Sequence, residues 1–338
     1  MRAIRVSKAG GPDVLQLEGN LPVPIPGDNQ VQVQVKAVGI NPVEVYVRNG
    51  KWMGKMIYDD DDTRSVQNFP YTPGSDAAGI ITAVGADVKN LQVGDRVYTC
   101  TSVGSSGSYA EYMLAPADRV FHLPEQLSFS QGAALGIPYF TALRSLKHKA
   151  HVQAGQSVLV HGASGGVGLA TCQIAKYWGL DVVGTASTDA GAELVRAAGA
   201  RLVLNHKDKN HKQNLLDATG GKGFDVIMEM FGDLNLQLDL DVSAVKGHIV
   251  LIGGRGKSVI DPWAIMGREV KVDGVLRSLA TDAEWAEMAA DLAQAMKDGA
   301  INPIIDAEFI LPLEKAPEAH KAIMEHVSGS KGKIVLIP

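Results

Sequence analysis

Residues 157–170 read Ser157-Val158-Leu159-Val160-His161-Gly162-Ala163-Ser164-Gly165-Gly166-Val167-Gly168-Leu169-Ala170. An apolar strand runs into small residues and then into a predicted helix, so backbone N–H groups and the positive end of the helix dipole meet at the turn. This arrangement is typical of a turn that binds the pyrophosphate of a dinucleotide. The glycine pattern, Ala163-x-Gly165-x-x-Gly168, departs from the usual G-x-G-x-x-G at its first position.

The chain around this turn alternates strands with helices from about residue 130 onward. We predict helices at 166–178 and 190–198, and strands at 157–161, 181–185, 201–205, 224–230, 247–252 and 270–276. Strands separated by helices of 10 to 15 residues form a parallel, doubly wound sheet. The second half of the chain is therefore predicted to be an α/β dinucleotide-binding domain.

The first 125 residues have a different pattern, with period-two alternation at 31–38 and 80–84 and turns such as Pro26-Gly27-Asp28. We predict that this half is all-β. The C-terminal residues carry helical patterns at 282–297 and 316–327, a turn at 311–313 and a final strand at 333–337. A chain that ends on a strand after the α/β unit predicts a discontinuous first domain with the α/β domain inserted into it.

Composition narrows the class of protein. A chain of 338 residues with 46% hydrophobic and 20% charged residues has the length of two domains and is not disordered. The net charge of −5 and the low aromatic content of 6% disfavour nucleic-acid binding. The sequence contains no apolar run of about 18 residues, so we expect no membrane segment. Two cysteines, Cys100 and Cys172, cannot form a disulfide framework, which fits a cytoplasmic protein.

The same glycine-rich turn also satisfies G-x-S-x-G, the nucleophile elbow of α/β-hydrolases, at Gly162 to Gly166. In that interpretation Ser164 is an acylation nucleophile. The α/β pattern begins only at this strand, whereas the elbow normally follows several strands, and Gly168 has no role in an elbow. These two points favour dinucleotide binding.

The end of the second predicted strand, Val183-Gly184-Thr185-Ala186-Ser187-Thr188, bears on the choice of dinucleotide. A site for NAD usually places a carboxylate there to bind the ribose hydroxyls. The absence of a carboxylate at this tip, with hydroxyls on Thr185, Ser187 and Thr188, favours NADPH, although Asp189 one step later is a candidate for the acidic role. His206, after the third strand, is either near the adenosine ribose or purely structural.

Several motifs together resemble one known family over essentially the whole chain. They are Asn41-Pro42-Val43-Glu44, Pro70-Tyr71-Thr72-Pro73-Gly74-Ser75-Asp76, Gly94-Asp95-Arg96-Val97, Gly136-Ile137-Pro138-Tyr139 and residues 160–168. The chain resembles the zinc-free quinone oxidoreductases of the medium-chain dehydrogenase/reductase superfamily, the ζ-crystallin family. The resemblance implies a mostly β, GroES-like catalytic domain of residues 1–126 and 278–338, with a Rossmann domain of residues 127–277 inserted into it.

Zinc-dependent relatives place Cys and a His-Glu pair where this chain looks to have Asn41 and Ser75-Asp76. Amide, hydroxyl and carboxylate oxygens are not the Cys/His set that holds a catalytic zinc, so we expect no metal. Without a Lewis acid the acceptor must already be electrophilic, as quinones and conjugated carbonyls are. The resemblance implies an NADPH-dependent quinone oxidoreductase with a small-molecule substrate. The alternatives are a 2-alkenal or enone C=C reductase and, in another class, an NADPH-binding structural or RNA-binding protein.

The resemblance also implies roles for individual residues. Asn41 and Tyr46 are the expected catalytic pair, orienting the acceptor oxygen by hydrogen bonds, and Tyr46 also lies near the nicotinamide. Arg255 is a candidate for binding the 2′-phosphate or a neighbouring oxygen. The expected cofactor-binding residues are Tyr46, Ser164, Gly165, Gly166, Val167, Gly168, Thr185, Ser187, His206, Asn235, Ile252, Gly253, Gly254, Arg255, Val275, Leu276 and Arg277.

The sequence departs from the family pattern at two places. The segment 51–69 is longer than expected and contains Asp59-Asp60-Asp61-Asp62, which we interpret as a solvated loop, and Trp52 and Met53, which either line a quinone site or cover the core. Position 191 is glycine and lacks the lysine that some relatives use beside the 2′-phosphate. The family implies a homodimer or homotetramer, with 270–276 as a pairing edge strand.

Overall fold

The computed structural model describes residues 1–50, 69–102, 107–325 and 331–338. The chain divides into two compact units. Unit 1 consists of Met1–Ile137, Pro303–Val327 and Lys333–Pro338, and unit 2 consists of Pro138–Asn302 and Ser328–Gly332. The first unit is therefore discontinuous in sequence, with most of the second inserted between its parts.

These limits differ from the 126 and 278 that the sequence analysis gives for the domain boundaries. Helix α9 (Asp282–Lys297) belongs to unit 2. The ring of Trp285 on this helix lies 4.8 Å from the ring of Phe140, and Glu284 accepts a hydrogen bond of 3.1 Å from Arg144. Contacts of this kind between segments 140 residues apart in sequence cannot be read from local patterns.

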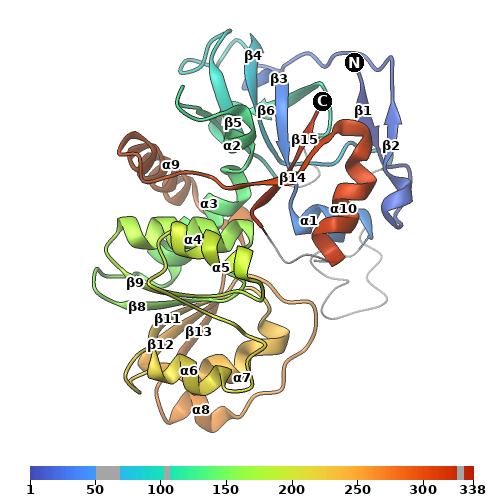
Figure 1. Cartoon of the computed structure of the whole chain (residues 1–338). Coiled ribbons are helices and arrows are strands. Elements are labelled where there is room, and N and C mark those ends of the chain that lie inside the picture. The colour runs from blue at the N-terminus through green and yellow to red at the C-terminus, as the bar shows by residue number, and fades with distance from the viewer. Residues whose placement is uncertain (51–68, 103–106, 326–330) are drawn as a thin grey trace. The chain divides into compact units, whose positions relative to one another are not determined.

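Unit 1 is built on a seven-stranded sheet in the order β14-β15-β3-β4-β5-β7, with β6 also paired to β3, and a separate pair β1-β2 (Figure 1). The alternation predicted near 31–38 is confirmed: along β3 the side chains of Val31, Val33 and Val35 are buried and their neighbours are partly exposed. The strands are β1 (Ala3–Arg5), β2 (Gln16–Glu18), β3 (Gln30–Gly39), β4 (Asp76–Val84), β5 (Arg96–Cys100), β6 (Tyr112–Pro116), β7 (Val120–His122), β14 (Ile305–Pro312) and β15 (Lys333–Ile337).

The prediction that the first 125 residues are all-β is wrong at one place, because a short helix, α1 (Pro42–Arg48), follows β3. Asn41 is its N-cap, Pro42 fills the first helical position, and Glu44 completes a capping box with Asn41. A seven-residue helix is too short to show a clear period of 3.6. Its sequence signal is the Asn-Pro-x-Glu start. The predicted turn at 311–313 is in fact the end of β14 followed by a 3-10 turn.

The remaining helices of unit 1 are α2 (Phe129–Ala133) and α10 (Ala316–Glu325), and the unit also contains 3-10 turns at η1 (Pro12–Val14), η2 (Ala117–Arg119) and η5 (Leu313–Lys315). A buried apolar core includes Ile4, Val33, Ile81, Met113 and Leu336. These side chains come from five strands, β1, β3, β4, β6 and β15, which the core packs together.

Unit 2 contains a six-stranded parallel sheet in the order β10-β9-β8-β11-β12-β13, which confirms the predicted doubly wound fold. Helices α4 and α5 cover one face of this sheet, and α6, α7 and α8 lie on the other (Figure 1). The strands are β8 (Ser157–Val160), β9 (Asp181–Thr185), β10 (Leu202–Leu204), β11 (Phe224–Glu229), β12 (Ser243–Leu251) and β13 (Lys271–Gly274).

The helices of unit 2 are α3 (Gly136–Leu143, which begins at the end of unit 1), α4 (Gly166–Tyr177), α5 (Asp189–Ala197), α6 (His211–Asp217), α7 (Gly232–Val242), α8 (Pro262–Met266) and α9, with a π-helical turn η3 (Arg144–Lys149) and a 3-10 turn η4 (Arg277–Leu279). Along the described ranges no helix combines the length and apolar character that crossing a bilayer requires.

Candidate active site

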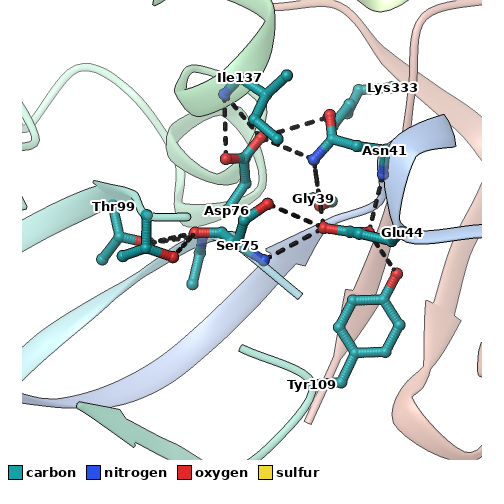
Figure 2. Close-up of polar contacts among 11 residues, drawn as sticks. Gly39, Asn41, Glu44, Ser75, Asp76, Thr99, Tyr109, Ile137 and Lys333 are labelled. Atoms are coloured by element: carbon teal, nitrogen blue, oxygen red, sulfur yellow. Dashed lines mark hydrogen bonds and ion pairs between the residues drawn. The ribbon is translucent and has the colours of Figure 1, made fainter. Parts of the chain in front are cut away.

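A buried polar cluster in unit 1 joins three segments that lie far apart in the sequence (Figure 2). Asn41 caps α1, Glu44 lies in its first turn, Ser75 and Asp76 stand at the start of β4, and Lys333 is the first residue of β15. All five are at most 5% exposed. We call these five residues the Asn41 cluster. It contains Asn41, Ser75 and Asp76, which stand where zinc-dependent relatives look to have their ligands.

The side chain of Asn41 has internal partners for its oxygen and its nitrogen. Its Nδ2 donates to Asp76 Oδ2 at 2.9 Å and to the Gly39 carbonyl at 3.3 Å. Its Oδ1 accepts from Lys333 Nζ at 2.5 Å. To donate to a substrate oxygen, Asn41 Nδ2 must therefore exchange one of its two internal hydrogen bonds. Its catalytic role stays a prediction.

The two carboxylates of the Asn41 cluster are well supplied with donors. Asp76 accepts from the Ile137 N–H through both oxygens, at 3.0 and 2.9 Å, and its Oδ2 lies 3.6 Å from Lys333 Nζ. Glu44 accepts from the N–H of Asn41 and from the N–H and hydroxyl of Ser75. Each buried charge thus has partners that replace water.

A second line of hydrogen bonds leads from Glu44 through buried Tyr109 to His320 and Arg48. The Tyr109 hydroxyl lies 2.7 Å from Glu44 Oε2 and 2.9 Å from His320 Nε2, and Arg48 donates to His320 Nδ1 at 3.2 Å. Because a guanidinium only donates, His320 Nδ1 is an acceptor and its Nε2 carries the proton. Burial and the nearby Arg48 charge lower the pKa of His320 to about 3.

Burial sets the direction of the other pKa values in this region. It raises the pKa of Glu44, and it lowers the pKa of Lys333, against which the Asp76 and Glu44 carboxylates act. Lys333, Tyr109 and His320 were not predicted from the sequence. Lys333 is 292 residues from Asn41, and no local pattern marks the lysine as buried.

In unit 2 the glycine-rich turn is fixed to the end of the neighbouring strand. The N–H of Gly162 donates to Thr185 Oγ1 at 3.2 Å, and the N–H of Ala163 donates to the Thr185 carbonyl at 3.0 Å. Gly162 has φ = +56°, which favours glycine. A Cβ on Gly168 would lie 2.6 Å from backbone atoms of Ala163 and Gly162. Only glycine at position 168 allows α4 to start this close to the turn.

The structure brings every expected cofactor residue of unit 2 to one edge of the sheet, because all six strands are parallel and each residue follows a strand. Ser164, Gly165, Gly166, Val167 and Gly168 follow β8; Thr185 and Ser187 lie at the end of β9, His206 after β10, Asn235 after β11, Ile252, Gly253, Gly254 and Arg255 after β12, and Val275, Leu276 and Arg277 after β13. This edge is the usual ligand position in open α/β sheets.

The positions of individual side chains at this edge differ in what they can contact. Thr185 is 1% exposed and its hydroxyl is used within the turn, whereas Ser187 is partly exposed. Arg255 is exposed, and its guanidinium lies 5.3 Å from the centre of the Phe231 ring. Strand β12 is three positions from β9, about 14 Å at the usual strand spacing. The binding role of Arg255, at the 2′-phosphate or a neighbouring oxygen, stays a prediction.

Arg277 and Tyr46 differ in their exposure. Arg277 is buried, with its guanidinium 5.3 Å from the centre of the Trp285 ring. Tyr46 is half-buried on α1, two residues after Glu44 of the Asn41 cluster. Trp52, Met53 and Asp59 to Asp62 lie outside the described residues, and the predictions for them stay predictions.

Comparisons with known proteins agree with this architecture. The family described as alcohol dehydrogenase GroES-like domain matches residues 27–125, and the family described as zinc-binding dehydrogenase matches residues 166–295. A quinone oxidoreductase of Pongo abelii is 47% identical over 337 residues, covering 100% of this chain and 98% of the relative. A quinone oxidoreductase of Homo sapiens is 46% identical with the same coverage. The crystal structure of Escherichia coli quinone oxidoreductase complexed with NADPH superimposes with a TM-score of 0.85 at 29% identity, covering 100% of both chains.

Proposed function

Because this chain belongs to the quinone oxidoreductase family of the medium-chain dehydrogenase/reductase superfamily, we propose that it is an NADPH-dependent reductase of quinones and other conjugated carbonyls. The observation that carries the proposal is the carboxyl edge of the sheet in unit 2. There a glycine-rich turn, the start of α4 and the ends of five further strands face the same side. The family relationship supplies the substrate class.

The residues at this edge fit a dinucleotide. Backbone N–H groups at the start of α4, together with the helix dipole, suit a pyrophosphate, and Gly168 keeps the helix close to the turn. The end of β9 carries Ser187 and no carboxylate, so a 2′-phosphate meets a hydroxyl there rather than a like charge. Residues 252–255 and 275–277 follow β12 and β13, which lie on the opposite side of β8 from β9 in the sheet. There they suit the nicotinamide half of the dinucleotide. The bound NADPH supplies a hydride.

In unit 1, the role we propose for Tyr46 is to orient the acceptor oxygen by a hydrogen bond, and for Asn41 to do the same after exchanging an internal partner. Lys333 Nζ lies between Asn41 Oδ1 and Asp76 Oδ2. Its positive charge disfavours a divalent cation at the same place. This charge and the lack of Cys and His in the Asn41 cluster support an electrophilic acceptor that needs no Lewis acid.

The experiment that tests the function is steady-state oxidation of NADPH with 9,10-phenanthrenequinone, 1,4-quinones and 2-alkenals. We expect turnover with at least one quinone. Fast reduction of 2-alkenals with no quinone turnover would show a C=C reductase instead.

Gly168→Val should raise the Kd of NADPH about tenfold or more, because the added side chain displaces α4 from the turn. Gly19→Ala, whose Cβ meets nothing within 4 Å, is the matched control and should bind normally.

We also propose that the protein is a cytoplasmic homodimer or homotetramer. β13 is an edge strand of the sheet in unit 2, as predicted for 270–276, and its outer side is open to pairing along the described chain. Val259, Trp263 and Met266, in the segment that precedes β13 in the sequence, are at least 60% exposed, which supports an interface between copies. Cys100 and Cys172 are both buried thiols, which fits a reducing compartment. Sedimentation that finds only monomers would contradict the assembly.

A further inference from the structure

Three ionisable side chains meet inside unit 2, directly below the glycine-rich turn. His161 follows β8, Glu229 is the last residue of β11, and Asp239 lies on α7. His161 Nε2 is 3.0 Å from Asp239 Oδ1 and 3.8 Å from Glu229 Oε2, and each of the three side chains is at most 3% exposed. We call these three residues the Glu229 cluster. None of them is an expected site residue.

The Glu229 cluster has too few hydrogen-bond donors for its acceptors. Glu229 Oε1 accepts from the Phe231 N–H and from Asn235 Nδ2. Glu229 Oε2 and both carboxylate oxygens of Asp239 have no hydrogen-bond donor within the residues that the structure describes. Buried carboxylates can only accept, so leaving three oxygens without a donor is costly. A proton held by one of the two acids supplies a donor and removes one buried charge.

The Glu229 cluster is also connected to the expected cofactor-binding residues. His161 Nδ1 lies 3.5 Å from Thr185 Oγ1, which anchors the glycine-rich turn. Glu229 binds Asn235 through its side chain, and its carbonyl accepts from the N–H groups of Ile252 and Gly253. A change of charge or geometry at Glu229 therefore reaches three segments of the cofactor-binding edge.

One carboxylate oxygen of Glu229 lies within 4.8 Å of one of Asp239. We propose that Glu229 and Asp239 hold one proton between them in the resting protein, and that this protonated pair is a positioning element for the dinucleotide. The inference rests on the proposed function, because it takes NADPH as the ligand. While the proton is held, the pair carries a single negative charge and the segments above it keep the binding geometry. Loss of the proton places a second negative charge below the pyrophosphate turn and weakens the binding of the anionic cofactor.

The electrostatics of the surrounding groups agree. Burial raises the pKa of Glu229 to about 7 and that of Asp239 to about 7, with the His161 interaction opposing the rise at Glu229. Burial lowers the pKa of His161. The other titratable groups that face His161 are His211 from α6, whose pKa is lowered to about 4, and His206 after β10, whose pKa is also lowered. The histidines are thus neutral near pH 7, and the proton belongs to the acid pair.

Infrared spectroscopy tests the bound proton directly. At pH 6.5 we expect the C=O stretch of a protonated carboxylic acid shielded from solvent exchange, and we expect it to disappear in both Glu229→Gln and Asp239→Asn. Asp241→Asn is the matched control, since Asp241 lies on the same helix but pairs with Lys212 at the surface. A band unchanged in both variants would overturn the proposal, as would one equivalent of a divalent metal that Asp239→Asn abolishes.

Titration of the protein with NADPH between pH 6 and 8.5 tests the effect on the cofactor. We expect the wild-type Kd to rise about three- to tenfold relative to that of Glu229→Gln, since the ionisation of the cofactor itself cancels in this ratio. Asp239→Asn should behave like Glu229→Gln, and Asp241→Asn like the wild type. If the wild type binds no NADPH, the proposed function fails. If it binds and the ratio is constant, only this inference fails.

Discussion

The Asn41 cluster and the Glu229 cluster are both buried, and each contains two carboxyl groups. They differ in the groups that offset the free-energy cost of removing these carboxyl groups from water. In unit 1 Lys333 lies 3.6 Å from Asp76 and hydrogen bonds reach both carboxylates from backbone and hydroxyl donors. In unit 2 the Glu229 cluster holds only His161 as a basic group, and three of its carboxylate oxygens lack a donor in the described chain.

Burial alone therefore does not decide how a buried acid responds to mutation, because the response depends on its donors and on nearby cations. Where a cation and donors are built in, the acids of the Asn41 cluster have partners in place of water, and removal of the cation leaves an uncompensated charge. Where donors are missing, the acids of the Glu229 cluster hold a proton, and removal of one acid relieves a cost. Opposite responses to mutation follow from the two arrangements.

The largest expected effect comes from Lys333→Met, which removes the cation of the Asn41 cluster while keeping a chain of similar length. We expect the free energy of unfolding to fall by about 3–5 kcal/mol, because Asp76 is left as an unpaired buried charge. Denaturant unfolding measures the change. Lys321→Met is the control: its lysine is 65% exposed and pairs with Glu325 on α10, so its loss should cost about 0.5 kcal/mol or less.

A second substitution distinguishes charge from packing at the same place. If the unpaired charge is the cause, adding Asp76→Asn to Lys333→Met should restore part of the lost stability. A double variant less stable than Lys333→Met by the full cost of Asp76→Asn would show independent effects and contradict the account.

A smaller effect of the opposite sign is expected in the Glu229 cluster. Glu229→Gln keeps an oxygen for the Phe231 N–H and removes one titratable acid. The raised pKa of Glu229 means that the folded state binds more protons than the unfolded state between about pH 4.5 and 7, so wild-type stability falls as pH rises through this window. The variant lacks this loss. We expect it to be more stable than the wild type by about 1–3 kcal/mol at pH 8, and similar at pH 5.

Denaturant unfolding at the two pH values checks this result, with Asp241→Asn as the control that should change little at either pH. A loss of stability at pH 8 comparable to that of Lys333→Met would mean that Glu229 is a paired charge. The Glu229 cluster would then resemble the Asn41 cluster and would not hold a proton.

The sequence was sufficient to predict the sheet of unit 2, because its strands and connecting helices carry strong periodic patterns. The predicted limits of the second strand, 181–185, and of the helix at 282–297 agree with β9 and α9. The same reasoning missed α1, whose seven residues are too few for a periodic signal. It also missed β14, where the pairing partner β15 follows an intervening helix.

The sequence could locate a local motif but could not identify partners that are distant along the chain. The glycine-rich turn at 162–168 is contiguous, and its anchoring to Thr185 follows from the parallel arrangement of two neighbouring strands. Lys333 and Asn41, or Asp239 and His161, meet only in the folded chain, and burial alone gives such common residue types their properties. A buried lysine and an exposed lysine look the same in a sequence.

The smallest expected effect concerns His320, which joins the Asn41 cluster to Arg48 as a neutral imidazole. Its pKa of about 3 in the folded state lies below that of an unfolded histidine, so the unfolded state binds more protons between about pH 6.5 and 3. Stability is therefore lost as pH falls through this window.

His320→Gln retains an acceptor for Arg48 and a donor for Tyr109 without this ionisation. We expect the loss of stability below pH 6.5 to be shallower by about 1 kcal/mol per pH unit in His320→Gln. His122→Gln, at a histidine with a 64% exposed side chain, should leave that slope unchanged. Equal slopes for all three proteins would mean that His320 is protonated without penalty, which the hydrogen bond from Arg48 to its Nδ1 does not allow.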